Sequence, residues 1–254
     1  MKGIILAGGN GTRLHPLTIV TNKHLIPVYN KPMIFYPIET FVKAGIKDLL
    51  IVTSAEFLKD FYKLLNTGRQ WGINIRYEIQ ESSNGTGGAI MCAKDFVNGD
   101  DFMVILGDNI VSGDLKNFVD KFTYEREFFK SKILITKSEN PKEYGVVNFV
   151  DNIVTDFEEK PEYPKSDYVA TGIWVFTSEV FDLLAEVKKS KRGEYEITDV
   201  FKKYITSGTL KCNILEDDWT DAGTFEQLFR ATKLVREREE KLADEDMLIQ
   251  SNAR

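Results

Sequence analysis

Cysteine and histidine are scarce in this chain of 254 residues, which has two of each. Cys92 and Cys212 lie far apart in the sequence, and neither belongs to a Cys-x-x-Cys pair. This spacing favours two buried thiols over a disulfide or a cysteine metal site. His15 and His24 show no metal-binding spacing, and we expect them to be packing or surface residues.

Long apolar runs and an excess of positive charge are also missing. No apolar run approaches the length that spans a membrane, and no signal segment precedes the first apolar strand. The net charge of −6 argues against a basic surface that coats nucleic acid. We therefore expect a cytoplasmic protein with no nucleic-acid and no membrane partner. A hydrophobic content of 43% gives ample material for a core.

The most informative segment covers residues 2–14. A short apolar run predicts a buried strand, and it stops at Gly8-Gly9-Asn10-Gly11. Glycines permit positive φ and close approach of the backbone, and successive N–H groups in such a turn form a nest for anions. Arg13 adds a permanent charge with a donor fork that suits phosphate. The alternative is a tight turn between a strand and a helix with no ligand.

Two common glycine motifs do not fit this segment. The phosphate loop of many ATPases needs Gly-x-x-x-x-Gly-Lys-Ser/Thr, and no such lysine follows. The dinucleotide fingerprint needs a third glycine where this chain has Leu14, which disfavours an NAD-dependent oxidoreductase.

Strands and helices alternate in the first half of the chain, which predicts an α/β fold with a mostly parallel sheet covered on both faces. The second half begins with a hairpin around Asp151-Asn152 and ends in a charged helix from Phe225. No linker and no repeat divides the chain, so we expect one domain. The predicted strands are 4–7, 49–53, 73–79, 102–106, 132–136, 145–150, 153–157, 168–176 and 210–215, and the predicted helices are 34–44, 56–65, 89–97, 115–128, 177–187 and 225–254.

Three charged residues outside the glycine loop are candidates for phosphate and metal chemistry. Lys23 lies in a long early loop and is a candidate phosphate ligand, unless it is a solvated surface lysine. Asp108 follows a buried strand, where a carboxylate faces the ligand cleft of an α/β sheet, although an Asx-turn would explain it too. Asp221 precedes the last helix and is either a second metal ligand or a helix cap. Magnesium prefers carboxylate oxygens together with substrate phosphates.

Two further segments have a functional and a plain interpretation. Glu159 and Lys160 would accept sugar hydroxyls and bind a phosphate, or they mark an exposed strand end. Residues 80–88 form a second glycine-rich loop, whose Gln80 amide and Gly85 backbone could read the edge of a base. A simple turn explains its glycines nearly as well.

These motifs, in this order, resemble the sugar-1-phosphate nucleotidylyltransferases over residues 1–233. Each motif is weak alone, but the ordered set is specific. The matching segments are residues 2–14, 31–34, 70–72, 106–109, 143–147, 157–161, 193–199 and 219–224.

The resemblance implies a Rossmann-like nucleotidyltransferase fold with a mixed central sheet and a smaller sugar-binding lobe. It divides the single domain into a nucleotide-binding half (1–136), a sugar-phosphate-binding lobe (137–224) and a C-terminal helix (225–254). It also implies roles for matched residues: Leu6, Ala7, Gly8, Gly9, Gly11, Thr12, Arg13, Gln80 and Gly85 would bind the nucleoside triphosphate, Arg13 and Lys23 would be catalytic, Asp108 and Asp221 would hold Mg²⁺, and Tyr144, Gly145, Glu159, Lys160 and Thr171 would bind the sugar phosphate.

The reaction implied is transfer of a thymidylyl group from dTTP to α-D-glucose 1-phosphate, giving dTDP-glucose and pyrophosphate in a homo-oligomer. One departure concerns the base loop, which reads Gly85-Thr86-Gly87-Gly88-Ala89 where thymidylyl members usually have Gly-Leu-Ala-Gln-Ala. A uridylyltransferase that uses UTP is therefore the near alternative. A non-catalytic nucleotide-sugar sensor is the far one.

Overall fold

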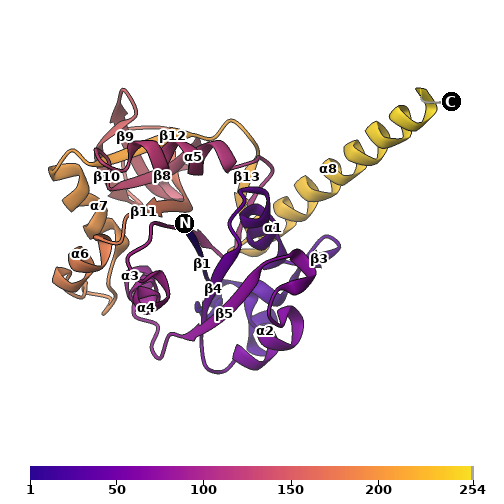
Figure 1. Cartoon of the computed structure of the whole chain (residues 1–254), viewed down its shortest axis with the longest axis horizontal. Coiled ribbons are helices and arrows are strands. Elements are labelled where there is room, and N and C mark those ends of the chain that lie inside the picture. Colours follow the sequence, from indigo (N-terminus) through magenta and orange to yellow (C-terminus); the bar gives the residue numbers. More distant parts are fainter. Residues whose placement is uncertain (253–254) are drawn as a thin grey trace.

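The computed structural model describes the backbone of residues 1–252 and the side chains of residues 1–244. Within this part of the chain, nine strands form one mixed sheet (Figure 1). They are β1 (Lys2–Leu6), β4 (Asp48–Thr53), β5 (Asn74–Ile79), β6 (Phe102–Leu106), β8 (Ser131–Lys137), β9 (Gly145–Val150), β10 (Ile153–Glu159), β11 (Tyr168–Phe176) and β12 (Leu210–Ile214).

The strand order is β5-β4-β1-β6-β11-β8-β12-β10-β9. The first four strands run parallel, with Gly3 of β1 opposite both Leu49 of β4 and Met103 of β6. The predicted α/β fold with a mixed sheet is confirmed, but its parallel part is smaller than repeated βαβ units suggest. The reason is β11, which inserts antiparallel between β6 and β8.

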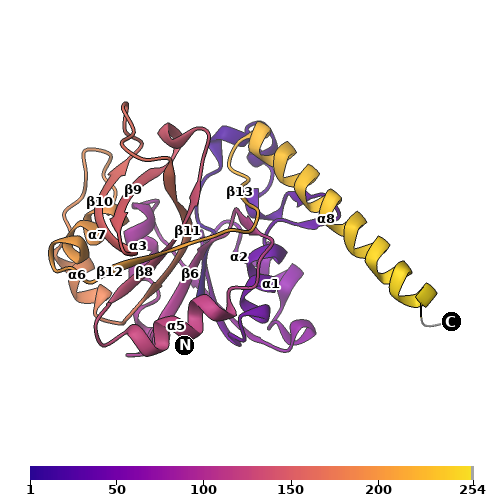
Figure 2. The same cartoon turned by 90° about the horizontal axis from the view of Figure 1, so that it is seen from above.

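Helices cover both faces of the sheet, as Figures 1 and 2 show. Because side chains alternate along a strand, Ile4 of β1 packs in one core and Ile5 in the other. The Ile4 face is covered by α3 (Gly85–Met91), α4 (Lys94–Val97), α6 (Val180–Glu186) and α7 (Ile197–Thr206), and the Ile5 face by α1 (Phe35–Lys43), α2 (Leu58–Leu65) and α5 (Lys116–Glu125).

Two α-helices differ from the sequence-based prediction by more than a shift of their ends. The predicted helix 89–97 is divided into two helices, because the chain turns at Cys92-Ala93 between α3 and α4. Helix α3 also starts earlier than predicted, at Gly85. Helix α7 was not predicted, and its buried stripe includes Ile197, Val200 and Phe201. The hairpin at Asp151-Asn152 is confirmed.

Two short ribbons lie outside the main sheet. Strand β7 (Asn109–Val111) pairs antiparallel with β13 (Trp219–Asp221), which joins segments that are far apart in the sequence. Strand β2 (Pro27–Val28) pairs with β3 (Lys31–Pro32) in the long early loop.

The last helix, α8 (Phe225–Asn252), leaves the body of the molecule as a projecting rod (Figures 1 and 2). Its first turns pack on the body through Ala231 and Val235, beside Val28 and Met33. Residues 253–254 of the predicted helix lie outside the described residues. In the part of the chain that the structure describes, no helix combines the length and apolarity needed to cross a membrane.

Candidate active site

The carboxyl ends of the four parallel strands bring distant residues to one edge of the sheet. The glycine loop follows β1, Gln80 follows β5, and Asp108 follows β6 after one glycine. Backbone hydrogen bonds hold these ends together, from Gln80 N to Thr53 O (2.8 Å) and from Gly107 N to Leu6 O (2.9 Å). In open α/β sheets ligands bind at this edge.

The glycine loop depends on its lack of side chains. Gly11 has a φ of 61°, and a Cβ there would lie 2.9 Å from the Thr18 side chain. The Thr18 hydroxyl donates to the Gly11 carbonyl (2.8 Å). The loop therefore keeps an open, backbone-lined surface in front of β1.

One cavity of about 400 Å³ opens beside this loop; we call it the Gln80 cavity. Of the residues predicted to bind nucleotide, Ala7, Gly11 and Thr12 lie outside its wall. The wall is formed by Leu6, Gly8, Gly9, Asn10, Arg13, Lys23, His24, Gln80, Ser83, Gly85, Thr86, Ala89, Leu106, Asp108 and Glu194.

A second cavity of about 640 Å³, which we call the Tyr144 cavity, lies next to the first. All five residues predicted to bind the sugar phosphate line it, and so does Asp221. The residues common to both cavities are Arg13, Thr86, Leu106 and Asp108.

The β9–β10 hairpin builds one wall of the Tyr144 cavity. Glu159 is paired with Gly145, and Lys160 N donates to Tyr144 O (3.0 Å). A Cβ on Gly145 would lie 2.5 Å from the Phe157 ring, so only glycine fits there. Lys160 has a φ of 47°, a strained conformation for a non-glycine residue that is often kept at functional sites.

Thr171 lies on β11 at the back of the Tyr144 cavity. It is only 1% exposed, and its hydroxyl donates to Leu134 O (2.8 Å). The hydroxyl proton is thus committed to the sheet, and Thr171 can offer a ligand only its methyl group and oxygen lone pair.

The two predicted metal ligands are brought together by the β7–β13 ribbon. Asp221 is paired with Asn109, and Ala222 N donates to Asp108 O (2.9 Å). Asp108 accepts from Lys23 Nζ (2.5 Å), and Asp221 accepts from Tyr144 OH (3.2 Å). Two carboxylates therefore flank the junction of the cavities, each with its own donor.

The electrostatics differ between these two carboxyl groups. Burial opposes ionisation of Asp108, but the charge and hydrogen bond of Lys23 outweigh it and hold its pKa well below the usual range. Burial, followed by the charge of Asp108, raises the pKa of Asp221 to about 6. A cation at the junction would relieve this repulsion.

His24 is buried beside the site, as expected for a packing residue. Burial and the charge of Lys23 lower its pKa to about 3, so its ring is neutral near pH 7. Its Nδ1 lies 2.7 Å from Asn22 Oδ1, and Asn22 Nδ2 donates to Ala7 O (3.1 Å). The pair braces the loop that carries Lys23 against the glycine loop.

The residues present fit a divalent cation such as Mg²⁺. Among the described residues, no cluster of three or more His, Cys, Asp or Glu could form a metal site by itself. Asp108 and Asp221 provide two carboxylates, and Mg²⁺ usually completes such a pair with water and substrate phosphates.

Sequence reasoning gave no role to two residues that shape the site, Asn109 and Gln227. Asn109 Oδ1 accepts from Gly172 N (2.9 Å) and Trp219 Nε1 (2.8 Å), while its Nδ2 donates to Asp108 Oδ1 (3.1 Å). Gln227 Nε2 donates to Tyr144 OH (3.1 Å). The position of Asn109 directly after Asp108 was a usable signal, whereas that of Gln227 inside a helix was not.

A family model described as nucleotidyl transferase matches residues 2–238. The chain belongs to the nucleotidyl transferase family. Among curated relatives, the glucose-1-phosphate thymidylyltransferase of Mycolicibacterium smegmatis is 40% identical over 93% of this chain and 82% of its own length. The enzyme of the same name from Neisseria meningitidis is 38% identical over 93% of this chain and 83% of its own length.

Solved structures agree with this assignment. A Bacillus anthracis protein described as a candidate glucose-1-phosphate thymidylyltransferase, in complex with sucrose, has a TM-score of 0.88 and 42% identity, over 93% of this chain and 95% of that chain. A UDP-glucose pyrophosphorylase complexed with UDP-glucose has a TM-score of 0.82 and 25% identity, over 93% of this chain and 98% of that chain. The resemblance to sugar-1-phosphate nucleotidylyltransferases is thereby confirmed.

Proposed function

We propose that this protein transfers a thymidylyl group from dTTP to α-D-glucose 1-phosphate and releases pyrophosphate. The observation that carries the proposal is the junction of the two cavities, where Arg13 and Asp108 belong to both walls. Such a junction lets two anionic substrates meet at one point between a cation and a metal-binding carboxylate. The curated relatives named above carry the same activity in their names.

In this proposal the Gln80 cavity takes the nucleoside triphosphate. The glycine loop offers backbone N–H groups to the phosphates, and Gln80 and Gly85 face the base. Lys23, now paired with Asp108, lies on the same wall and can turn from the carboxylate to a phosphate.

The Tyr144 cavity takes the sugar phosphate. Glu159 accepts hydrogen bonds from sugar hydroxyls, and Lys160 binds the phosphate as a point charge. Tyr144 and Gly145 form the adjoining wall.

The proposed cofactor is Mg²⁺, held by Asp108 and Asp221. When bound, it supplies charge neutralisation and orientation for the triphosphate. Tyr144 donates to Asp221 and Asn109 donates to Asp108, so each carboxylate is fixed by a neighbouring side chain.

The chemistry needs no general base, because the sugar phosphate is already ionised near pH 7. One of its oxygens forms a bond to the α-phosphorus while the α–β bridging P–O bond breaks, and pyrophosphate leaves with that electron pair. Repulsion between two polyanions is the main obstacle. Arg13, Lys23 and Lys160 offset it, and the cavity walls align the attack.

A uridylyltransferase is the second candidate. Its support is the base loop, which lacks the Leu-Ala-Gln sequence usual in thymidylyl members, together with the likeness to a UDP-glucose pyrophosphorylase. A non-catalytic sensor is disfavoured, because the chain keeps Arg13, Lys23, Asp108 and Asp221.

The decisive experiment measures pyrophosphate release with glucose 1-phosphate, Mg²⁺ and, in turn, dTTP, UTP, CTP, ATP and GTP. We expect the highest kcat/KM with dTTP. A higher value with UTP would support the uridylyltransferase instead. Binding of nucleotide without release, for any sugar 1-phosphate, would support the sensor.

The proposal includes a homo-oligomer that works in the cytoplasm, where nucleoside triphosphates are available. The support for the homo-oligomer is the outer part of α8, where the apolar side chain of Leu242 is half exposed in the single chain and a second chain could cover it.

A further inference from the structure

The side-chain amide of Gln80 is held in one orientation. Its Nε2 donates to the backbone oxygen of Gly85 (3.2 Å) and to Asn84 Oδ1 (2.7 Å). A backbone oxygen can only accept, so the nitrogen of the amide, and not its oxygen, must face Gly85. Asn84 must in turn present its oxygen to that nitrogen. Both N–H donors of Gln80 are therefore in use.

The carbonyl oxygen of the same amide lies at the glycine loop. Gln80 Oε1 is 2.7 Å from the position that a Cβ on Gly8 would take, and both residues line the Gln80 cavity. No residue in the described part of the chain donates a hydrogen bond to this oxygen. Gln80 therefore offers a ligand an acceptor and no donor.

Asn84 accepts this hydrogen bond from Gln80 instead of capping helix α3. It stands at the N-cap of α3, where an asparagine side chain normally accepts from the first turn, yet it makes no capping bond. Its side chain instead folds over the helix toward Gln80. This path is open only because position 88 is glycine, since a Cβ there would lie 2.0 Å from Asn84 Oδ1.

We propose that Asn84 and Gly88 act together as positioning residues that commit Gln80 to accept a hydrogen bond from the base. Thymine and uracil have a donor N–H at ring position 3, whereas cytosine has an acceptor nitrogen there. The arrangement thus selects bases with an imino N–H and rejects cytosine. This inference rests on the proposed function, because it assumes that the base occupies the Gln80 cavity.

The test compares kcat/KM for dTTP and dCTP, each with glucose 1-phosphate, in wild type and four variants. Asn84→Ala leaves the Gly85 oxygen as the only acceptor of the Gln80 amide nitrogen and so weakens the hold on its orientation. We therefore expect the dTTP to dCTP ratio to fall about tenfold, through KM for the nucleotide more than kcat. Asn84→Asp keeps the acceptor oxygen and should keep the ratio within about threefold of wild type.

Gly88→Ala tests the same arrangement without replacing either amide side chain. Alanine is favourable in a helix, but its Cβ would displace the Asn84 side chain, so the ratio should fall as in Asn84→Ala. In the double variant Asn84→Ala/Gly88→Ala, the Asn84 amide that the new Cβ would displace is absent. We therefore expect the dTTP to dCTP ratio to fall no further than in Asn84→Ala. This non-additivity is the signature of coupled residues.

Equal losses with dTTP and dCTP in both single variants would show a merely structural role and overturn the proposal. Calorimetric titration of each variant with dTTP or dCTP alone separates the inference from the proposed function. If the wild type binds both nucleotides equally, the inference fails even where the transfer reaction is observed. If it prefers dTTP but releases no pyrophosphate, the proposed function fails and the inference stands. Thermal melting identifies any variant that does not fold.

Discussion

At the scale of single residues, Arg13 has the most central position. It belongs to the walls of both cavities, and its guanidinium lies 3.1 Å from where a Cβ on Gly223 would be. Gly223, just before α8, therefore lets the backbone lie directly against the Arg13 guanidinium. Arg13 can offset charge on either substrate from this position.

Replacing Arg13 with alanine should lower kcat at least about 100-fold, the scale of losing one transition-state charge contact. Arg13→Lys keeps the charge but loses the planar fork, and we expect an intermediate loss. His15→Ala is the control, since His15 is exposed and outside both cavity walls. Steady-state turnover near the wild-type value in Arg13→Ala would reject the catalytic role.

Asp108→Asn and Asp221→Asn should each raise the Mg²⁺ concentration needed for half-maximal rate, because each removes a charged ligand. Asp156→Asn changes a carboxylate that lines neither cavity and should leave the titration unchanged. The rate is measured against Mg²⁺ concentration at saturating substrates. The metal assignment is wrong if neither site variant moves the midpoint.

At the scale of secondary-structure elements, Asn109 connects three strands. It belongs to β7 and accepts from Gly172 of β11 and Trp219 of β13. Asn109 is 3% exposed, and its side-chain oxygen is the acceptor of both N–H groups. The geometry of the carboxylate pair thus depends on a neutral side chain.

Asn109→Ala should lower the free energy of unfolding by roughly 2–4 kcal/mol, since it leaves the buried N–H of Gly172 and the part-buried indole N–H of Trp219 without their acceptor. Trp219→Phe removes one of these bonds and should cost less. Urea denaturation measures both. An Asn109→Ala protein as stable as wild type would mean that the N–H groups find other acceptors.

A second link joins α5 to the sheet. Glu125 at the end of α5 accepts from Lys132 of β8 and Lys211 of β12, each at 2.8 Å. The Lys132 side chain is only 1% exposed, and burial lowers its pKa. Burial opposes ionisation of Glu125, but the two lysines outweigh it, so its pKa lies below its usual range.

Glu125→Gln should therefore destabilise the fold by roughly 2 kcal/mol at pH 7, because Lys132 loses its counter-charge. Because the pKa of Glu125 is lower in the folded state, its ionised carboxylate stabilises the folded protein at pH values above the usual carboxyl pKa. This stabilisation is lost as the pH falls through the lowered pKa. The difference from wild type should therefore shrink below about pH 4. Glu127→Gln, on a 78% exposed side chain, is the control. A pH-independent difference would contradict the charge argument.

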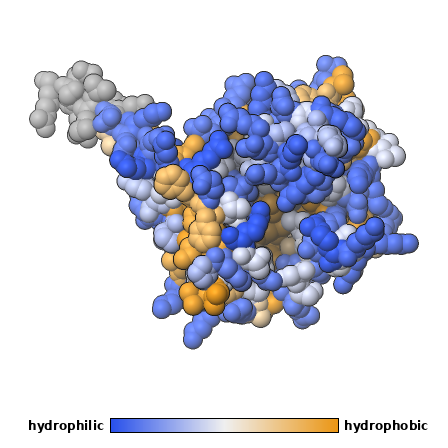
Figure 3. Space-filling view, turned by 180° about the vertical axis from the view of Figure 1, so that it is seen from behind, coloured by the Kyte–Doolittle hydropathy of each residue, from blue (hydrophilic) through white to orange (hydrophobic). Residues whose placement is uncertain are grey.

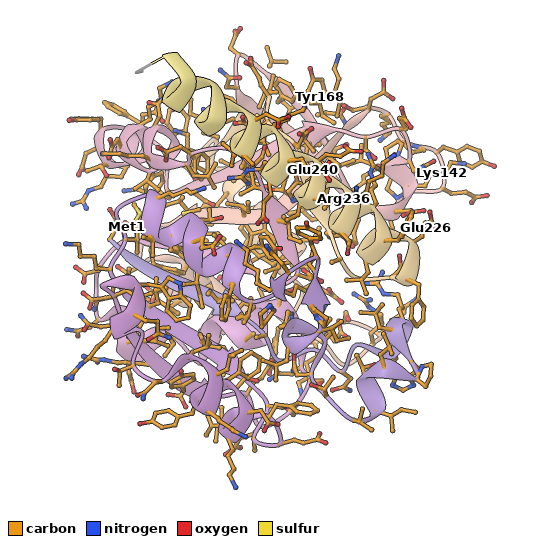
Figure 4. The ribbon with its side chains drawn as sticks, turned by 90° about the vertical axis from the view of Figure 1, so that its right-hand side faces the viewer. Met1, Lys142, Tyr168, Glu226, Arg236 and Glu240 are labelled. Carbon is orange, nitrogen blue, oxygen red and sulfur yellow. The ribbon has the colours of Figure 1, made fainter. Side chains whose placement is uncertain are left out.

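At the scale of the whole molecule, the projecting helix α8 stands out. Figure 4 shows Glu226 near its root and Arg236 and Glu240 farther along, and the last two form an ion pair at 2.8 Å. Seen from behind in Figure 3, hydrophobic residues form a strip on the surface near this helix. A helix that projects in this way lacks the tertiary packing that usually stabilises helices.

We expect sedimentation velocity to give an oligomer for the full chain and a smaller species for a chain that ends at Glu240. Leu242→Glu in the full chain should act like the truncation, because it replaces a half-exposed apolar side chain with a charged one. Arg236→Gln, which alters only a surface ion pair, is the control. A full chain that sediments as a monomer at every concentration would contradict the homo-oligomer.

Much of the site could be predicted from the sequence, because its signals are local. A strand that stops at glycines followed by Arg13 indicates a phosphate loop, and Asp108 directly after a buried strand indicates a cleft residue. Gln227 and Asn84 were missed, because each acts on another side chain through a hydrogen bond that no spacing reveals. The same limit hid α7, whose helical pattern follows a charged loop without a clear start signal.

The sequence by itself determined the α/β class, most strands and helices, and the residues able to handle phosphate, because periodicity and glycine content act over a few positions. The tertiary structure decided what those residues face. The β7–β13 pairing brings Asp221 to Asp108, the insertion of β11 makes the sheet mixed, and Gly88 lets Asn84 reach Gln80. These are long-range or steric contacts, which arise only when distant segments pack together.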